Sequence, residues 1–271
     1  MPGLIERKQV GSDTISPIGL GTYGIKNYSK AFEAYVYGLT NGIDHVDTAE
    51  MYDMGRAEEF VGEVLKQVGR DGVFITTKML PNRLDDREKI VRAAQESLRR
   101  IGVSYVDLYL IHWPNERLSI TQQVQNFEVL VDKGLTRYIG VSNFSLSQLK
   151  EAVYATKKAP IVALQVHYSV LNRREVEEQL LPYCAFQKIL LQAYTPIERG
   201  SVKDNPCVRA VSEKTGRTPI QVALNYLISH ENVVAIPKAE RVEHVKELIG
   251  AMGWRIPEAH INYLRKCLEE H

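Results

Sequence analysis

Four side chains that can carry or move protons follow short apolar runs of the sequence. Asp47, Lys78 and His112 each stand at the carboxyl end of such a run, and Tyr52 follows five residues after the first of them. If the runs are neighbouring strands of one parallel barrel, their carboxyl ends meet at one mouth. An acid, a phenol, an amine and an imidazole would then form one proton-donating site.

The chemistry of this set would centre on Lys78. A buried ammonium is costly unless it is paired, and Asp47 is the carboxylate that would pair with it. An ammonium beside Tyr52 would stabilise the phenolate and lower the tyrosine pKa below its usual ~10. Tyr52 would then be a better acid near neutral pH and would protonate a carbonyl oxygen that receives hydride.

Each of these residues also has a structural interpretation. Asp47 would cap a loop, Lys78 would be a surface lysine with a buried stem, and His112 would be a hydrogen-bonded core histidine. Any one of them alone is more often structural than catalytic. Because convergence of all four on one rim by chance is much rarer, the catalytic interpretation is favoured.

Eight apolar runs alternate with amphipathic segments along the chain. The candidate strands are residues 15–20, 45–48, 73–78, 108–112, 138–142, 163–167, 190–194 and 233–237. Nearly continuous apolar runs are typical of parallel strands covered by helices, and strict alternation predicts a parallel α/β sheet. Eight units in 271 residues favour closure into a (β/α)8 TIM barrel. An open doubly wound sheet is the alternative.

Amphipathic periodicity predicts helices at residues 56–68, 87–101, 121–133 and 146–156. The long connection before the last strand predicts helices at 205–214 and 218–229, and two more are expected at 242–252 and 258–268. The barrel would thus carry two extra helices. Residues 4–15, which turn near Gly11, predict a hairpin that plugs the barrel bottom. Since no linker interrupts residues 1–271, we expect a single domain.

The composition is that of a soluble globular protein, with 44% hydrophobic and 25% charged residues. A net charge of +1 gives no electrostatic case for nucleic acid or an anionic membrane as a partner. Cys184, Cys207 and Cys267 lie far apart and suggest neither a disulfide framework nor a zinc site, which fits a reducing cytoplasm. No signal-peptide core and no apolar run of ~18 residues is evident. We expect a cytoplasmic monomer, since no apolar helix face stands out.

A glycine pattern near the start resembles a dinucleotide fingerprint. Residues 19–24 match GxGxxG, and Asp44 lies further on, as in a Rossmann site. The context disagrees, because Pro17 lies in the preceding strand and no helix begins at the glycines to meet a pyrophosphate. The favoured interpretation is a strand-to-loop turn, with Gly21 and Thr22 lining the barrel mouth.

As an ordered set, seven short motifs make the chain resemble the aldo-keto reductases, of the short prokaryotic type, nearly from end to end. They cover residues 42–52, 77–78, 110–114, 140–144, 164–168, 193–197 and 236–238. Each motif alone is weak, but the ordered set is specific. The resemblance implies an eight-stranded barrel with two extra helices, in agreement with the pattern above. It also implies an oxidoreductase that reduces aldehydes and ketones to alcohols.

The resemblance implies a role for each residue of the site. Tyr52 would be the proton donor, Lys78 would lower its pKa, and Asp47 would pair with Lys78. His112 would orient the carbonyl and share in proton transfer. Because the loop at 113–121 is short, we expect an open pocket for small aldehydes or activated ketones. The substrate would lie among aromatic rings, those of Tyr23, Tyr52, His112 and Trp113.

Aldo-keto reductases bind NADPH, often in preference to NADH, without a Rossmann domain. By position, Ser142, Asn143 and Gln165 would hold the nicotinamide carboxamide, and Tyr194 would stack on its ring. The loop after Tyr194 would follow the pyrophosphate. The residues implied in cofactor binding are, in full, Gly21, Thr22, Asp47, Ser142, Asn143, Gln165, Tyr194, Thr195, Ile197, Arg199, Lys238, Ala239, Arg241, His244 and Glu247.

The region implied for the adenosine 2′-phosphate departs from the common family pattern. Lys238 would meet the phosphate and Glu247 the adenine. However, Ala239 stands where Ser or Thr is common, and His244 where Arg is common. Arg241 would compensate electrostatically. We therefore predict that NADPH is preferred and that NADH is also used.

Two other functions stay open at this level. The same fold serves as a channel-associated or regulatory subunit that binds nucleotide with little turnover, although an intact set of Tyr52, Lys78 and His112 argues against it. A metal-dependent barrel hydrolase would need clustered His and Asp ligands at strand ends. The seven histidines are scattered along the chain, so we expect no metal.

Overall fold

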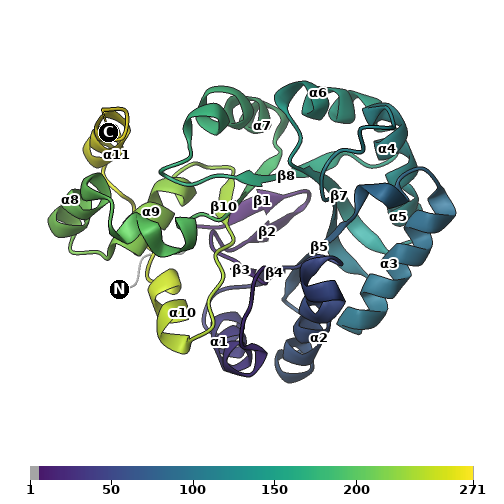
Figure 1. Cartoon of the computed structure of the whole chain (residues 1–271), viewed down its shortest axis with the longest axis horizontal. Helices are drawn as coiled ribbons and strands as arrows, with labels where there is room; N and C mark the ends of the chain where they lie inside the picture. Colours follow the sequence, from purple (N-terminus) through teal and green to yellow (C-terminus); the bar gives the residue numbers. More distant parts are fainter. Residues whose placement is uncertain (1–5, 271) are drawn as a thin grey trace.

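A ring of eight parallel strands forms the centre of the protein, whose computed structural model describes residues 6–270. The ring closes where Ile18 pairs with Ala235, and the amide of Ala235 donates to the carbonyl of Pro17. Figure 1 shows the strands enclosed by helices. The predicted barrel is confirmed. Its strands are β3 (Leu20–Gly21), β4 (His45–Asp47), β5 (Phe74–Met79), β6 (Val106–Ile111), β7 (Thr136–Ser142), β8 (Ile161–His167), β9 (Leu190–Tyr194) and β10 (Val233–Ala235).

Helices cover the outside of the ring, and two further helices, α8 (Pro206–Thr215) and α11 (Glu258–Cys267), lie beside each other at its edge (Figure 1). No helix within residues 6–270 is both long and apolar enough to cross a membrane. The covering helices are α1 (Tyr28–Thr40), α2 (Arg56–Val68), α3 (Arg87–Ile101), α4 (Ile120–Phe127), α5 (Val129–Asp132), α6 (Leu146–Ala155), α7 (Leu181–Gln187), α9 (Pro219–Ile228) and α10 (Val242–Ile249).

Polar caps fix where several helices begin. The Asp86 carboxylate accepts hydrogen bonds from two backbone amides at the start of α3, which satisfies donors that have no partner inside the helix. Thr218 and Gln221 form a reciprocal capping box at the start of α9. The predicted bounds of α2 and α3 are confirmed.

The structure departs from the predicted elements in three main ways. The helix predicted at 121–133 is divided at Glu128, whose carboxylate accepts three backbone amides of the loop at 157–159. The strand predicted at 15–20 is interrupted: Ile15 ends a hairpin strand, and β3 begins only at Leu20. Pro17 between them has no amide hydrogen to donate. Helix α7, preceded by a π-helical turn at Val176–Leu180, was not predicted.

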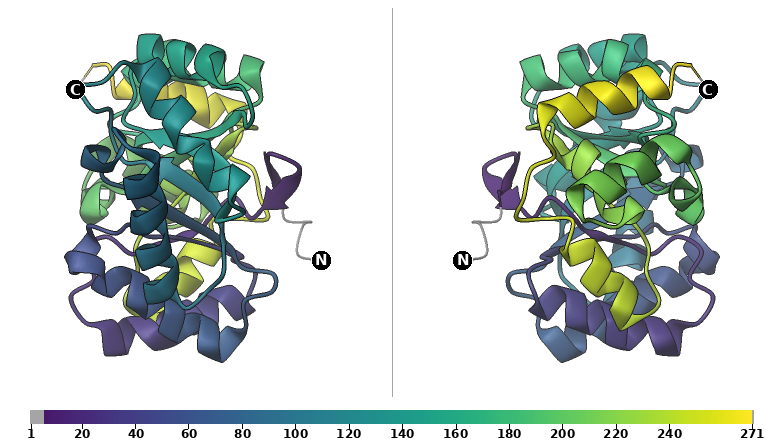
Figure 2. Two further views of the ribbon diagram at one scale, coloured as in Figure 1. Left: turned by 90° about the vertical axis from the view of Figure 1, so that its right-hand side faces the viewer. Right: turned by 90° about the vertical axis from the view of Figure 1, so that its left-hand side faces the viewer.

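An antiparallel hairpin, β1 (Lys8–Val10) and β2 (Asp13–Ile15), covers one end of the barrel (Figure 2). Val10 and Ile15 are buried against interior side chains of the strands. The Lys8 ammonium donates to the carbonyls of Ile228 and His230, at 2.9 and 2.8 Å. The predicted plug is therefore confirmed, although its predicted start at residue 4 lies outside the described residues.

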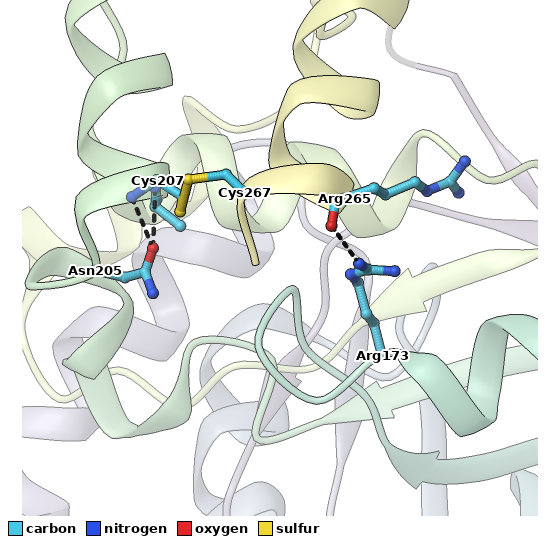
Figure 3. Close-up of a disulfide and its surroundings, with 6 residues drawn as sticks. Arg173, Asn205, Cys207, Arg265 and Cys267 are labelled. Atoms are coloured by element: carbon cyan, nitrogen blue, oxygen red, sulfur yellow. Dashed lines mark hydrogen bonds between the residues drawn. A yellow bond between two sulfur atoms is a disulfide. The ribbon is translucent and has the colours of Figure 1, made fainter. Parts of the chain in front are cut away.

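A disulfide between Cys207 and Cys267 joins the first turn of α8 to the end of α11 (Figure 3). The two residues are 60 positions apart, with their Cα atoms 5.9 Å from each other. The Arg173 guanidinium also holds α11, by donating to the carbonyl of Arg265 at 2.8 Å (Figure 3). The interpretation that the cysteines form no disulfide is wrong for this pair, because only the folded chain brings α8 and α11 together. Cys184 is buried and unpaired.

Candidate active site

Three adjacent strands place the predicted catalytic residues at one mouth. Asp47 is the last residue of β4, Lys78 lies near the end of β5, and His112 directly follows β6. All three side chains are buried. Tyr52 is half-buried and begins a single turn, Tyr52–Gly55, in the loop after β4. The predicted convergence of the four residues is therefore observed.

The Lys78 ammonium is the centre of the hydrogen bonding. Its Nζ donates to Asp47 Oδ1 at 2.6 Å, to the Thr48 carbonyl at 2.8 Å and to Tyr52 Oη at 3.0 Å. An ammonium has three donors and no acceptor, so all of its donors are used. Because Tyr52 Oη accepts from Lys78, the phenolic proton points away from Lys78 and is free to be donated elsewhere.

Burial and charge act in opposite directions on this pair. Burial alone would lower the pKa of Lys78, but the Asp47 carboxylate and Tyr52 outweigh it and raise that pKa above its ordinary value. Burial raises the pKa of Tyr52, although the Lys78 charge and hydrogen bond lower it in part. The prediction that Lys78 brings the Tyr52 pKa below its usual value is therefore wrong, because desolvation of the phenolate is the larger effect.

His112 is a neutral imidazole beside Tyr52. Burial, assisted by the Lys78 charge, lowers the pKa of His112 to about 3. The two rings meet edge to face, with their centroids 5.7 Å apart. His112 Nδ1 is buried and has no hydrogen-bond partner among residues 6–270. The site therefore holds one neutral imidazole and one protonated phenol at neutral pH.

Aromatic rings line the mouth, as predicted for the substrate side. The Tyr23 ring lies 5.1 Å from the Tyr52 ring, and the His112 ring lies 4.7 Å from the Trp113 ring. Tyr23 is 61% exposed, so it forms the outer edge of this row. The row leads from solvent to the Tyr52 hydroxyl.

Residues predicted to hold the nicotinamide form a second hydrogen-bonded group. Asn143 Nδ2 donates to the His112 carbonyl at 3.0 Å and to Ser142 Oγ at 3.2 Å. The Tyr194 hydroxyl donates to Asn143 Oδ1 at 2.9 Å. Asn143 has a positive φ of 59°, which turns its side chain at the end of β7. These side chains thus lie at the same mouth as His112.

Gln165 connects the two groups. Its Nε2 donates to Asp47 Oδ2 at 2.7 Å and to Gln192 Oε1 at 2.9 Å. The carboxylate that holds Lys78 therefore also accepts from a residue of the predicted nicotinamide set. Gln192 Nε2 is buried and meets no hydrogen-bond partner within the described range of residues 6–270. Gln192 was not predicted, because a polar residue inside an apolar strand does not by itself reveal which way it points.

The loop predicted to follow the pyrophosphate has an unusual backbone. Thr195, Glu198 and Arg199 all have positive φ angles, between 47° and 54°. Glu198 fixes the loop, since its Oε1 lies 2.7 Å from His167 Nε2 and accepts from the Ser169 hydroxyl at 2.6 Å. Arg199 is exposed. Ile197 is partly buried and packs against the core.

The glycine turn lies at the seam of the barrel. The Gly21 amide donates to the Pro237 carbonyl at 3.0 Å, and a Cβ at this position would lie 2.6 Å from the Ile236 carbonyl oxygen. The Thr22 amide donates to the Asp47 carbonyl, while Thr22 Oγ1 is buried and has no partner among the described residues. Helix α1 begins only at Tyr28, so no helix N-terminus meets the glycines.

The residues predicted for the 2′-phosphate follow β10. Lys238 Nζ lies 2.5 Å from Glu240 Oε1, and Ala239 between them is buried. The Arg241 guanidinium donates to His244 Nε2 at 2.5 Å. Glu247 lies further along α10 and is partly buried. Among the residues described, no hydrogen bond joins these side chains to Lys78.

The sequence interpretation missed Glu240 and the Thr48 carbonyl. A backbone carbonyl carries no sequence signal. Glu240 did carry a sequence signal, because residues two apart in an extended segment, such as Lys238 and Glu240, point to the same side. Within residues 6–270, no group of three His, Cys, Asp or Glu side chains is arranged to hold a metal ion.

Comparisons with known proteins agree with this geometry. The model of the Aldo/keto reductase family matches residues 17–269. The chain is 31% identical to methylglyoxal reductase YeaE of Escherichia coli over 266 residues, which cover 95% of this chain and 92% of that protein. It is 34% identical to glyoxal reductase of Bacillus subtilis over 231 residues, which cover 84% and 80% of the two chains.

Solved structures resemble the chain over nearly its whole length. An aldo-keto reductase from Klebsiella pneumoniae, crystallised with NADPH, has a TM-score of 0.90 at 29% identity, covering 98% of this chain and 95% of that one. The thermostable aldo-keto reductase Tm1743, crystallised with the inhibitor epalrestat, has a TM-score of 0.89 at 34% identity, covering 97% and 99%.

Proposed function

The chain belongs to the aldo/keto reductase family, and from this premise we propose that it reduces small aldehydes and activated ketones to alcohols with NADPH. The observation that carries the proposal is the buried Lys78 ammonium, which donates to both Asp47 and Tyr52. Two relatives are named for the reduction of methylglyoxal and glyoxal. Their names support small, reactive carbonyl compounds as the substrate class.

Tyr52 is the proton donor in this proposal. When bound, NADPH would supply the hydride for the carbonyl carbon. Because Tyr52 Oη accepts from Lys78, its own proton is available to the carbonyl oxygen. Its raised pKa keeps the phenol protonated at neutral pH. Once the proton is given up, the Lys78 ammonium stabilises the phenolate that remains.

His112 positions the carbonyl as a neutral hydrogen-bond donor. An imidazole whose pKa is about 3 holds no extra proton to give at neutral pH. It can still donate one hydrogen bond to the carbonyl oxygen beside Tyr52. We therefore assign the proton transfer to Tyr52 alone. The ring of Trp113 against His112 supports the imidazole in this orientation.

The residues at the mouth fit a nicotinamide cofactor. Buried polar atoms normally have partners, yet Thr22 Oγ1 and Gln192 Nε2 have none in the part of the chain that the structure describes. Thr22 is hydrogen-bonded to Asp47, and Gln192 is hydrogen-bonded to Gln165. A carboxamide, which both donates and accepts, would be held by Ser142, Asn143 and Gln165, with Tyr194 against the ring. Arg199 would meet the pyrophosphate, and Lys238 the 2′-phosphate.

An assay with NADPH and a panel of small aldehydes, including methylglyoxal and glyoxal, tests the proposal through loss of cofactor absorbance. Tyr52→Phe should lower kcat by roughly 10²- to 10⁴-fold, the usual contribution of a general acid. The cofactor Kd should stay unchanged, because the ring is kept. Tyr154→Phe, on the exposed face of α6, is the matched control and should react like the wild type.

Two outcomes would contradict the proposal in different ways. Undiminished turnover by Tyr52→Phe would remove the proton-donor role. NADPH binding without turnover on any aldehyde would favour a nucleotide-binding regulatory subunit. Either result leaves the family membership intact, since that rests on the comparisons.

We also propose that the protein acts as a monomer in the cytoplasm. Among the large exposed apolar side chains, Tyr154, Phe186 and Tyr263 come from three different helices, and scattered residues of this kind are ordinary on monomers. The Cys207–Cys267 disulfide withdraws the support that separate cysteines gave to a reducing cytoplasm, so this location is proposed from the composition of a soluble protein. Sedimentation at the 30.7 kDa monomer mass and fractionation of intact cells test the two proposals separately.

A further inference from the structure

Glu240 is a fixed carboxylate beside the lysine proposed to meet the 2′-phosphate. Its Oε1 accepts from Lys238 Nζ at 2.5 Å and from the Lys26 amide at 3.2 Å. Its Oε2 accepts from the Asn27 amide at 2.9 Å. Exposed ion pairs are usually loose and weak. This carboxylate instead accepts from three donors, one at residue 238 and two at residues 26 and 27. Its side chain is only 17% exposed.

The surroundings keep Glu240 ionised. Asn27 is the N-cap of α1, so the carboxylate lies at the positive end of a helix. Burial alone would raise the pKa of Glu240, but the hydrogen bonds from Lys238, Lys26 and Asn27 outweigh it and lower that pKa. A full negative charge therefore lies against the Lys238 ammonium at neutral pH.

We propose that Glu240 is a specificity-determining residue, which reduces the preference of the site for NADPH over NADH by acting as an internal counter-ion of Lys238. The inference rests on the proposed function, in which Lys238 meets the 2′-phosphate. That phosphate would have to compete with a fixed carboxylate for the ammonium and would be repelled by it. The 2′-hydroxyl of NADH carries no charge and meets neither penalty.

The neighbouring side chains do not restore the lost attraction. Ala239 is buried and offers no hydroxyl. The Arg241 guanidinium donates to the imidazole of His244, so its donors are directed to that ring, although it keeps its charge. Lys238 is therefore the cation whose availability to the 2′-phosphate Glu240 controls.

Equilibrium binding of NADPH and NADH to the full chain, followed by calorimetry, tests the proposal without turnover. E240Q should tighten NADPH binding by about tenfold, the size expected when a charged hydrogen-bond competitor is removed. NADH binding should change by less than about twofold. Adenosine 2′-monophosphate and adenosine 5′-monophosphate, as probes of the phosphate subsite, should show the same contrast between E240Q and the wild type.

Two further variants serve as controls for E240Q. E243Q removes the same charge from an exposed position in the first turn of α10, and it should leave the ratio of the two Kd values unchanged. In a K238M background, E240Q should no longer tighten NADPH, because the ammonium that it releases is absent. An equal gain in that background would overturn the proposal.

A purely structural role of Glu240 gives a different outcome. If the carboxylate only fixes the start of α1, E240Q will lower Tm and leave the ratio of NADPH to NADH affinity as in the wild type, which would overturn the inference alone. Failure of the wild-type protein to bind either dinucleotide would overturn the proposed function and this inference together.

Discussion

Lys78 couples the residues of the site through its three hydrogen bonds. Two of them, to Asp47 and the Thr48 carbonyl, hold the ammonium in place, and the third fixes the hydroxyl of Tyr52. Burial raises the pKa of the tyrosine, which suits a group that must stay protonated until a carbonyl arrives. The lysine therefore matters more for the phenolate after transfer than for the acidity of the phenol before it.

The neutral His112 ring makes stability sensitive to acid. Its pKa is about 3 in the folded chain and about 6.5 in an unfolded one. Below pH 6.5 the unfolded chain takes up a proton at this residue that the folded chain does not, so the contribution of His112 is present above pH 6.5 and is lost as pH falls toward 3. Between pH 6.5 and 4 the free energy of unfolding of His112→Gln should therefore fall less than that of the wild type. The difference is at most about 1.4 kcal/mol per pH unit.

Urea denaturation at several pH values measures this difference. His260→Gln, in α11 outside the barrel, is the matched control and should follow the wild-type curve. Equal pH dependence of the wild type and His112→Gln would show that the imidazole is not held neutral by its burial.

Side-chain positions at strand ends could be predicted from the sequence, but hydrogen-bond partners could not. Asp47, Lys78 and His112 each follow an apolar run, and the parallel order of the strands then brings them together. The spacing of Lys238 and Glu240 is a local signal for their pairing, but the amides of residues 26 and 27 that fix the carboxylate lie over 200 positions away. Local patterns carry no signal for such distant contacts.

At the scale of helices and strands, the disulfide between α8 and α11 is the main unpredicted feature. It closes a loop of 60 residues, and the chain-entropy relation gives about 4 kcal/mol for a loop of that size. Reduction, or Cys267→Ser, should therefore lower the free energy of unfolding by roughly 2–4 kcal/mol. Thermal unfolding with and without dithiothreitol measures the effect.

Cys184→Ser is the control for this prediction. Cys184 is buried and unpaired, and burial raises the pKa of its thiol to about 12, so it should resist alkylation in the folded protein. Mass spectrometry after alkylation should show two additional modified cysteines once the protein is reduced. Equal Tm values for oxidised and reduced protein would mean that the bond does not constrain the unfolded chain.

Elements with local signals were the ones that could be predicted. Helix α3 has an aspartate cap, an apolar stripe and a C-terminal glycine, Gly102, in the left-handed region, so its ends follow from the sequence. Helix α7 and the turn before it lack a side-chain cap at either start. Their position depends on contacts such as Glu177 with Tyr168 and Tyr226, which no local pattern reveals.

At the scale of the whole molecule, the barrel seam and the hairpin join the first strands to segments more than 200 positions later in the chain. Ile18 pairs with Ala235, and Lys8 donates to carbonyls at the end of α9. Each of these contacts joins residues more than 200 positions apart in the sequence. We therefore propose that residues 1–271 form one cooperative domain, although chains of this length often unfold through intermediates.

The two tryptophans allow this proposal to be tested at distant points of the fold. Trp113 lies at the mouth beside His112, and Trp254 lies after α10, where its indole donates to the Gly250 carbonyl. Trp113→Phe and Trp254→Phe each leave one fluorescent reporter. In each variant, with the disulfide intact, the fluorescence midpoint in guanidinium chloride should coincide with the far-ultraviolet circular dichroism midpoint, as a single transition requires. If the Trp254 reporter changes at lower denaturant than the dichroism signal, the C-terminal helices unfold as a separate unit, and the contacts across the seam do not make the barrel cooperative.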